Sequence, residues 1–129
     1  MSEVFKKRRE EIILNPYCKL RDSQMILFKK LLTERSKGKP ISYITGKKDF
    51  WKNEFIINKN SLVPRPDSEL IVQEVLKYLK NKTSLKLLEI GVGSGCILLS
   101  VLNERKDAYG TGIDISKECI ELTEINSKK

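Results

Sequence analysis

The residues best suited to chemistry surround a glycine-rich segment in the second half of the chain. Residues 85–90 form an apolar run that predicts a buried strand, and Gly91, Gly93 and Gly95 follow it at alternate positions. Glycine tolerates positive φ angles and lets a ligand approach the backbone without meeting a Cβ atom. Residues 96–103 then predict an apolar helix, whose N-terminus carries a partial positive charge. A ligand site is therefore expected at the carboxyl end of this strand.

The spacing of the glycines and one neighbouring carboxylate narrow the class of ligand. A dinucleotide fingerprint is Gly-x-Gly-x-x-Gly and a P-loop needs Gly-Lys-Ser or Gly-Lys-Thr. Here the third glycine comes one residue early, Cys96 follows it, and no lysine follows the glycines. Glu89, just before the turn, would repel a pyrophosphate but suits a ligand with an ammonium and a sulfonium group. S-adenosylmethionine carries both groups.

A second acidic residue stands at the end of the next predicted strand. Asp114 comes 23 residues after Gly91, where a carboxylate at the tip of a neighbouring strand can accept hydrogen bonds from ribose hydroxyls. Ile115 could then pack on the adenine ring. In the alternative interpretation, Asp114 or Ser116 simply caps the helix that follows. The predicted cofactor contacts are Glu89, Gly91, Val92, Gly93, Ser94, Gly95, Asp114 and Ile115.

The first half of the chain predicts helices followed by strands. Residues 3–37 are expected to be helical with a break at Asn15-Pro16, because the residue before proline avoids the α-helical region. Asp22 or Ser23 is expected to cap the second helix, and Gly38 to follow its end. Residues 41–63 contain short apolar runs separated by turn residues, which predict a β-hairpin with its turn at Lys52-Asn53.

The second half predicts alternating helices and strands. Asp67 is expected to cap a helix, and residues 85–90, 96–103, 109–115 and 117–126 then predict strand, helix, strand and helix. The apolar face of the first of these helices is predicted to contain Leu70, Ile71, Val75, Leu76 and Leu79. Such alternation indicates a parallel sheet, so the predicted fold class is α/β.

Composition excludes several classes of protein. A chain of 129 residues suffices for about one domain. No apolar run approaches the ~18 residues of a membrane span, and the charged N-terminus is wrong for a secretory signal, so a cytoplasmic protein is expected. The chain has three cysteines, no Cys-x-x-Cys and no histidine. A metal site, a disulfide framework and a histidine-activated nucleophile are therefore not expected.

Net positive charge is confined to one half of the chain. Residues 1–64 hold 15 Lys and Arg against 7 Asp and Glu, whereas residues 65–129 hold 10 of each kind. A basic half beside a neutral half suggests that the first half meets an acidic partner. The alternative is a solvated, lysine-rich surface with no partner.

Several segments outside the glycine loop point to one family. Residues 35–46 contain Arg-x-x-Gly-x-Pro-x-x-Tyr-Ile-x-Gly, residues 49–51 are Asp-Phe-Trp, and residues 62–70 are Leu-Val-Pro-Arg-Pro-Asp-Ser-Glu-Leu. With the glycine loop and residues 112–116, the sequence resembles the glutamine-N5 methyltransferases that modify peptide chain release factors. The resemblance covers nearly the whole chain from about residue 10.

The resemblance implies both an architecture and a reaction. Residues 1–38 would be part of a helical domain that engages the release factor, and residues 39–63 a hairpin linker. Residues 64–129 would begin a class I, Rossmann-like methyltransferase sheet. The enzyme would transfer a methyl group from S-adenosylmethionine to the side-chain amide nitrogen of a glutamine. The family usually has Asp and Thr where this chain has Glu89 and Val92.

One motif of the family is absent from this sequence. The acceptor motif Asn-Pro-Pro-Tyr does not occur, and Asn15-Pro16-Tyr17 lacks its second proline. The chain is therefore expected to be truncated at both ends, to contain no catalytic residue and to be inactive alone. Two alternatives stay open: a fragment of a nucleic-acid amino-group (adenine N6) methyltransferase, or a catalytically inactive remnant. The basic half favours the first of these, whereas the motifs at residues 35–46 and 62–70 argue against it.

Overall fold

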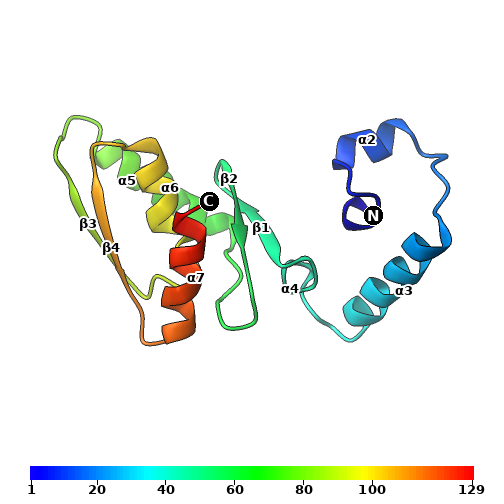
Figure 1. The fold of residues 1–129 in the computed structure, drawn as a ribbon. Helices are drawn as coiled ribbons and strands as arrows, with labels where there is room; N and C mark the ends of the chain where they lie inside the picture. Colours follow the sequence, from blue (N-terminus) through cyan, green and yellow to red (C-terminus); the bar gives the residue numbers. More distant parts are fainter. The chain divides into compact units, whose positions relative to one another are not determined.

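The computed structural model describes all 129 residues. The chain divides into two compact units, Met1–Thr45 and Gly46–Lys129, and each is described by itself (Figure 1). Together they make a mixed α/β protein. The predicted fold class is confirmed at this level.

The first unit consists of four helices, α1 (Ser2–Phe5), α2 (Arg9–Leu14), α3 (Asp22–Ser36) and α4 (Ile41–Thr45). Helix α2 ends directly before the Asn15-Pro16 pair, as the proline effect on the preceding residue predicts. Helix α3 ends just before Gly38, whose φ of +86° confirms the predicted stop.

Two local predictions in this unit are wrong. Helix α3 is not capped by Asp22 or Ser23, since Asp22 is already helical and the Arg21 N–H donates to Gln24 Oε1 at 3.0 Å. Residues 41–45 form a helix instead of a strand. The Pro40 carbonyl accepts the N–H groups of Tyr43 and Ile44 there, and the fixed φ of proline suits the start of a helix.

Little of the first unit is buried. Val4 is the one buried residue in it, and its carbonyl accepts a hydrogen bond from Gln24 Nε2 of α3. Large apolar side chains remain exposed on this unit: Ile13, Leu14, Tyr17, Ile26 and Leu32. The helical periodicity of α3 was therefore no guide to burial in this unit.

The second unit begins with the predicted β-hairpin. Strands β1 (Lys47–Phe50) and β2 (Asn53–Ile56) pair antiparallel with Phe50 opposite Asn53. The turn lies at Trp51-Lys52, one residue earlier than expected, and Trp51 adopts the left-handed conformation with φ +54°. Its backbone N–H donates to Glu69 Oε1 at 2.9 Å. That bond helps to hold a conformation that non-glycine residues rarely adopt.

Helix α5 (Glu69–Tyr78) follows a single 3-10 turn, Pro66–Ser68. Asp67 lies inside that turn, so its predicted role as the cap of the helix is wrong. The buried residues of α5 and its C-terminus are Val72 and Leu79, whereas Leu70 and Ile71 are exposed. Val75 and Leu76 are half-buried, so the predicted face is confirmed at Val75, Leu76 and Leu79 and wrong at Leu70 and Ile71.

Two parallel strands carry the glycine segment. Strand β3 (Lys86–Ile90), helix α6 (Cys96–Glu104), strand β4 (Tyr109–Ile113) and helix α7 (Lys117–Ser127) follow α5. Strands β3 and β4 pair in parallel, with Glu89 opposite Gly112 and Ile90 opposite Ile113. In Figure 1 helices α5, α6 and α7 lie between this strand pair and the hairpin.

The two faces of the β3–β4 pair differ. Gly110 and Gly112 face the loop and helix, where an added Cβ would lie 2.6 Å from Leu102 Cδ1 and 2.7 Å from Val92 Cγ2 respectively. On the opposite face Leu88 is 62 % and Ile90 77 % exposed. On the covered face Leu87 and Glu89 are only half-buried, so the prediction of a buried strand is wrong.

Candidate functional site

The glycine segment forms a tight turn at the carboxyl end of β3. Gly91, Gly93 and Gly95 all have positive φ, at +77°, +58° and +78°. The N–H groups of Gly91 and Val92 both donate to the Ile113 carbonyl, at 2.8 and 3.0 Å, and the Gly95 N–H donates back to the Val92 carbonyl at 2.8 Å. The turn is therefore fastened to the end of β4.

The three glycines serve different purposes. A Cβ atom on Gly91 would meet nothing within 4 Å, and one on Gly93 only the Gly91 carbonyl oxygen at 4.0 Å. A Cβ atom on Gly95 would lie 2.9 Å from both Leu99 and Thr123 side-chain atoms. Gly95 thus allows helices α6 and α7 to approach, whereas Gly91 and Gly93 border open space. Only the latter two leave room for a ligand.

Asp114 and the glycine turn are in direct contact. The Gly93 N–H donates to Asp114 Oδ2 and the Ser116 N–H to Asp114 Oδ1, both at 2.9 Å. The hydrogen bonds from Ser116 and Gly93 hold the pKa of the Asp114 carboxyl below its ordinary value. Its carboxylate has about four lone-pair sites, so acceptor positions remain for a ligand. Ser116 caps α7, since its Oγ accepts the Cys119 N–H at 3.2 Å.

Glu89 lies on the covered face of the strand pair. Its Oε2 accepts the N–H of Leu98, in the first turn of α6, at 3.0 Å. Burial raises the pKa of the Glu89 carboxyl above its ordinary value, and the hydrogen bond from Leu98 offsets only part of that effect. The geometry places a partly desolvated carboxylate at the positive end of a helix.

The remaining predicted contacts have contrasting surroundings. Val92 is buried against Gly112, so its side chain serves packing and only its backbone could face a ligand. Ser94 is also buried. Ile115, next to Asp114 in the bend between β4 and α7, is fully exposed.

Two residues of α7 outside the predicted cofactor contacts also hold the turn. Thr123 Oγ1 donates to the Gly93 carbonyl at 3.1 Å, and Asn126 Nδ2 donates to the Ser94 carbonyl at 2.8 Å. Their signal in the sequence is the spacing of three residues, which places them on one side of a helix. Asn126 continues the buried side of α7 that contains Cys119 and Leu122.

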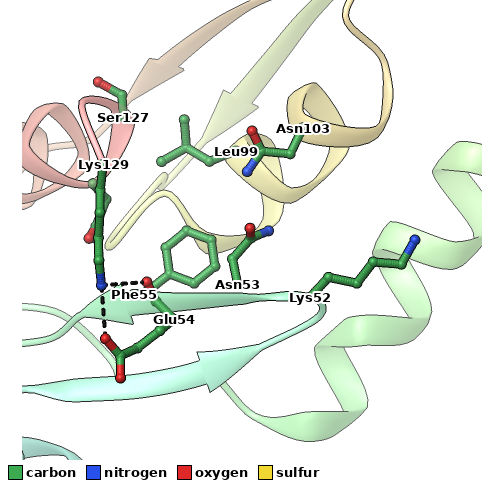
Figure 2. Close-up of a pocket in the computed structure, with 9 residues that line it drawn as sticks. Lys52, Asn53, Glu54, Phe55, Leu99, Asn103, Ser127 and Lys129 are labelled. Atoms are coloured by element: carbon green, nitrogen blue, oxygen red, sulfur yellow. Dashed lines mark hydrogen bonds and ion pairs between the residues drawn. The ribbon is translucent and has the colours of Figure 1, made fainter.

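A separate hollow of about 350 Å³ lies between the hairpin, α6 and α7 (Figure 2). Phe55 and Leu99 line it, and Lys129 Nζ spans one side to Glu54 Oε1 at 2.9 Å. None of the predicted cofactor contacts lines this hollow. The glycine turn with Asp114 therefore remains the candidate site.

No three His, Cys, Asp or Glu side chains gather closely enough to hold a metal ion. The three cysteines have free thiols. None of the helices combines the length and apolar character that crossing a bilayer requires.

The sequence of the chain is similar to one family model and to several known proteins. Residues 1–46 match the family model described as the PrmC N-terminal domain. A release factor glutamine methyltransferase from Caulobacter vibrioides is 44 % identical over 119 residues, which cover 92 % of this chain and 41 % of the relative. The enzyme of the same name from Buchnera aphidicola is 41 % identical over 128 residues, covering 99 % and 46 %.

A third relative has a broader name. A bifunctional methyltransferase from Rickettsia bellii is 32 % identical over 155 aligned residues, covering 100 % of this chain and 28 % of the relative. The chain spans less than half the length of each of these three relatives.

Proposed function

Because the chain is homologous to the release factor glutamine methyltransferases over nearly its whole length, we propose that it holds the methyl donor of such an enzyme. The proposed ligand is S-adenosylmethionine, and the proposed site is the turn at residues 91–95 with Asp114. Strands β3 and β4, connected through α6, would be the start of a class I, Rossmann-like sheet.

The observation that carries this proposal is the contact between the turn and Asp114. The Gly93 N–H to Asp114 Oδ2 bond of 2.9 Å brings the open side of the glycines next to an ionised carboxylate. Both lie where two parallel strands end, which is the position that ligands occupy in open α/β sheets. Gly91 and Gly93 leave a space that any Cβ would begin to fill.

Each proposed contact matches one part of the ligand. The free lone pairs of Asp114 would accept hydrogen bonds from ribose hydroxyls, and the exposed side chain of Ile115 would cover one side of the adenine. The Glu89 carboxylate would attract the ammonium group. S-adenosylmethionine, when bound, supplies an electrophilic methyl group on its sulfonium. The residues of this chain would bind and orient the donor.

The proposed acceptor is a glutamine side chain of a peptide chain release factor, as the names of the relatives indicate. We assign no acceptor-binding residue within these 129 residues, because no Asn-Pro-Pro-Tyr motif occurs among them. The basic residues of the first half are the proposed contact with the protein substrate. An amino group in nucleic acid is the alternative acceptor that the same basic charge allows.

The cofactor site is tested by calorimetric titration with S-adenosylmethionine. We expect the wild-type chain to bind and Gly93→Val to abolish binding, because a β-branched side chain would occupy the open space beside the turn. Gly38→Val is the matched control, since Gly38 also has positive φ and open surroundings but lies in the first unit. Unchanged affinity in Gly93→Val, or equal losses in both variants, would contradict the proposed site.

A further inference from the structure

The side-chain amide of Asn126 bonds three backbone groups in two other segments, strand β2 of the hairpin and the glycine turn. Its Oδ1 accepts the Ile56 N–H at 2.8 Å, and its Nδ2 donates to the Ile56 carbonyl at 3.0 Å and to the Ser94 carbonyl at 2.8 Å. Only one orientation of the amide satisfies these contacts, because a backbone N–H needs the oxygen and the two carbonyls need the NH₂. The residue is 8 % exposed, so these bonds form away from water.

On the hairpin side, the Asn126 amide makes the hydrogen bonds that an adjacent strand would make. Ile56 is the last residue of β2, and the neighbouring Ile57 N–H bonds toward the other side, to the Gly46 carbonyl. The N–H and C=O of Ile56 therefore face α7. There Asn126 accepts a hydrogen bond from the N–H and donates one to the carbonyl. This is the exchange that a residue of an adjacent strand would make.

On the turn side, the same helix fixes two successive carbonyls. Thr123 donates a hydrogen bond to the Gly93 carbonyl, and Asn126 donates one to the Ser94 carbonyl. In a trans peptide the N–H points opposite to the preceding carbonyl. Holding the Gly93 carbonyl toward α7 therefore turns the Ser94 N–H away from α7.

We infer that Asn126 is a positioning residue that makes the shape of the cofactor turn depend on the docked hairpin. The inference deepens the proposed function, on which it rests for the identity of the ligand. Removal of the hairpin from α7 would leave the Asn126 amide without two of its three partners. The amide would then be free to rotate, and the Ser94 carbonyl would lose a fixed donor.

The coupling is tested in the complete chain by amide hydrogen exchange and by titration with S-adenosylmethionine. We expect Asn126→Ala to speed exchange at Ile56 and also at Gly93 and Gly95 of the turn, and to weaken binding about tenfold, as loss of buried hydrogen bonds implies. Asn103→Ala is the matched control, because Asn103 is an exposed helical asparagine whose Oδ1 meets only Lys106.

A second variant separates positioning from simple support of the fold. In Asn126→Asp the ionised carboxylate would face the Ser94 and Ile56 carbonyls, and the nearby Lys129 is already paired with Glu54. Protonation restores one donor. We therefore expect its affinity, relative to wild type at each pH, to recover as the pH falls from 8 to 5, whereas Asn103→Asp shows no such recovery.

Two results would overturn the inference. One is faster exchange confined to Ile56, with turn amides and affinity as in wild type. The other is lost affinity in Asn126→Asp that does not depend on pH, which would indicate a merely structural role. If the wild-type chain itself binds no S-adenosylmethionine, the proposed function fails, whereas exchange at Gly93 and Gly95 still decides the coupling.

Discussion

At the scale of single residues, Glu89 combines two opposing demands. Its carboxylate is partly desolvated, so the folded protein favours the protonated form, whereas attraction of an ammonium group requires the ionised form. Because the folded-state pKa is raised, the folded protein binds more protons than the unfolded chain between the two pKa values. The free energy of unfolding contributed by this group therefore falls as the pH rises through that interval.

Glu89→Gln should separate these two effects. We expect the variant to be at least as stable as wild type at pH 7, because the desolvated charge is gone and the amide oxygen can still accept the Leu98 N–H. Its affinity for S-adenosylmethionine should fall by about 1.5–3 kcal/mol, the range for hydrogen bonds to charged groups. Urea unfolding and calorimetry measure the two quantities.

The pH dependence gives the control for this prediction. Wild-type affinity should decrease as the pH falls through the raised pKa of Glu89, while Glu89→Gln lacks this decrease. Asp114 stays ionised over the same interval because its own pKa is lowered. An identical acid limb in both proteins would show that Glu89 does not face the ligand.

Sequence reasoning located the turn but not the direction of every side chain in it. The positive φ angles of Gly91, Gly93 and Gly95 follow from a local spacing, so they could be predicted. The burial of Val92 depends on Gly112 of the next strand, which no local pattern reports. The role of Asn126 in holding the turn was not predicted either. It depends on contacts with residues 32 and 70 positions away in the sequence, which no local pattern reports.

At the scale of elements, periodicity and breakers predicted which helices and strands exist better than they predicted their ends and faces. Asp67 failed as a cap because a 3-10 turn precedes α5. Residues 41–45 contain β-branched and aromatic side chains that favour strands, yet they follow Pro40 into a helix. In both places the local backbone geometry, set by a 3-10 turn or by a proline, outweighed the average structural preference of the residues.

Helix α6 can lie close to β4 only because Gly110 lacks a side chain. A Cβ there would be 2.6 Å from Leu102 Cδ1 and 2.9 Å from Leu98 Cδ1. We expect Gly110→Val to lower the free energy of unfolding by about 1–3 kcal/mol, the usual cost of overpacking. Thr111→Val on the exposed side of the same strand is the control, and equal unfolding midpoints in urea would refute the expected contact.

At the scale of the whole molecule, the unequal charge should govern encounters with the proposed protein substrate. A variant that reverses the four exposed charges Lys6, Lys7, Arg8 and Arg9 should associate more slowly with a release factor at low salt. At high salt the difference should shrink, because screening shortens the reach of surface charges. Stopped-flow association rates at several salt concentrations measure this.

A control variant of equal net charge tests whether the slower association depends on where the charges are reversed. It reverses four exposed lysines of the second unit, Lys77, Lys80, Lys82 and Lys86. We expect its association rate to stay near that of wild type. The same salt dependence in all three proteins would show that the basic first half does not steer the encounter.

The open side of the β3–β4 pair should make the 129-residue chain associate. Leu88, Ile90 and Ile113 are exposed on it, and β3 pairs on one side only, which leaves an edge that can add another strand. We expect light scattering to show particle size rising with concentration, and Leu88→Ser with Ile90→Ser to reduce that rise. Leu62→Ser, at an exposed loop position, should not. A wild-type chain that stays monomeric at all concentrations would contradict this expectation.

The turn of the hairpin has an optical consequence. Trp51 is the only tryptophan of the chain, and its indole Nε1–H donates to Glu104 Oε1 of α6 at 2.9 Å. Departure of the hairpin from the helices would replace that carboxylate by water around the indole. The wavelength of tryptophan fluorescence should therefore report hairpin docking in the unlabelled protein, on the timescale of the motion and without any substitution.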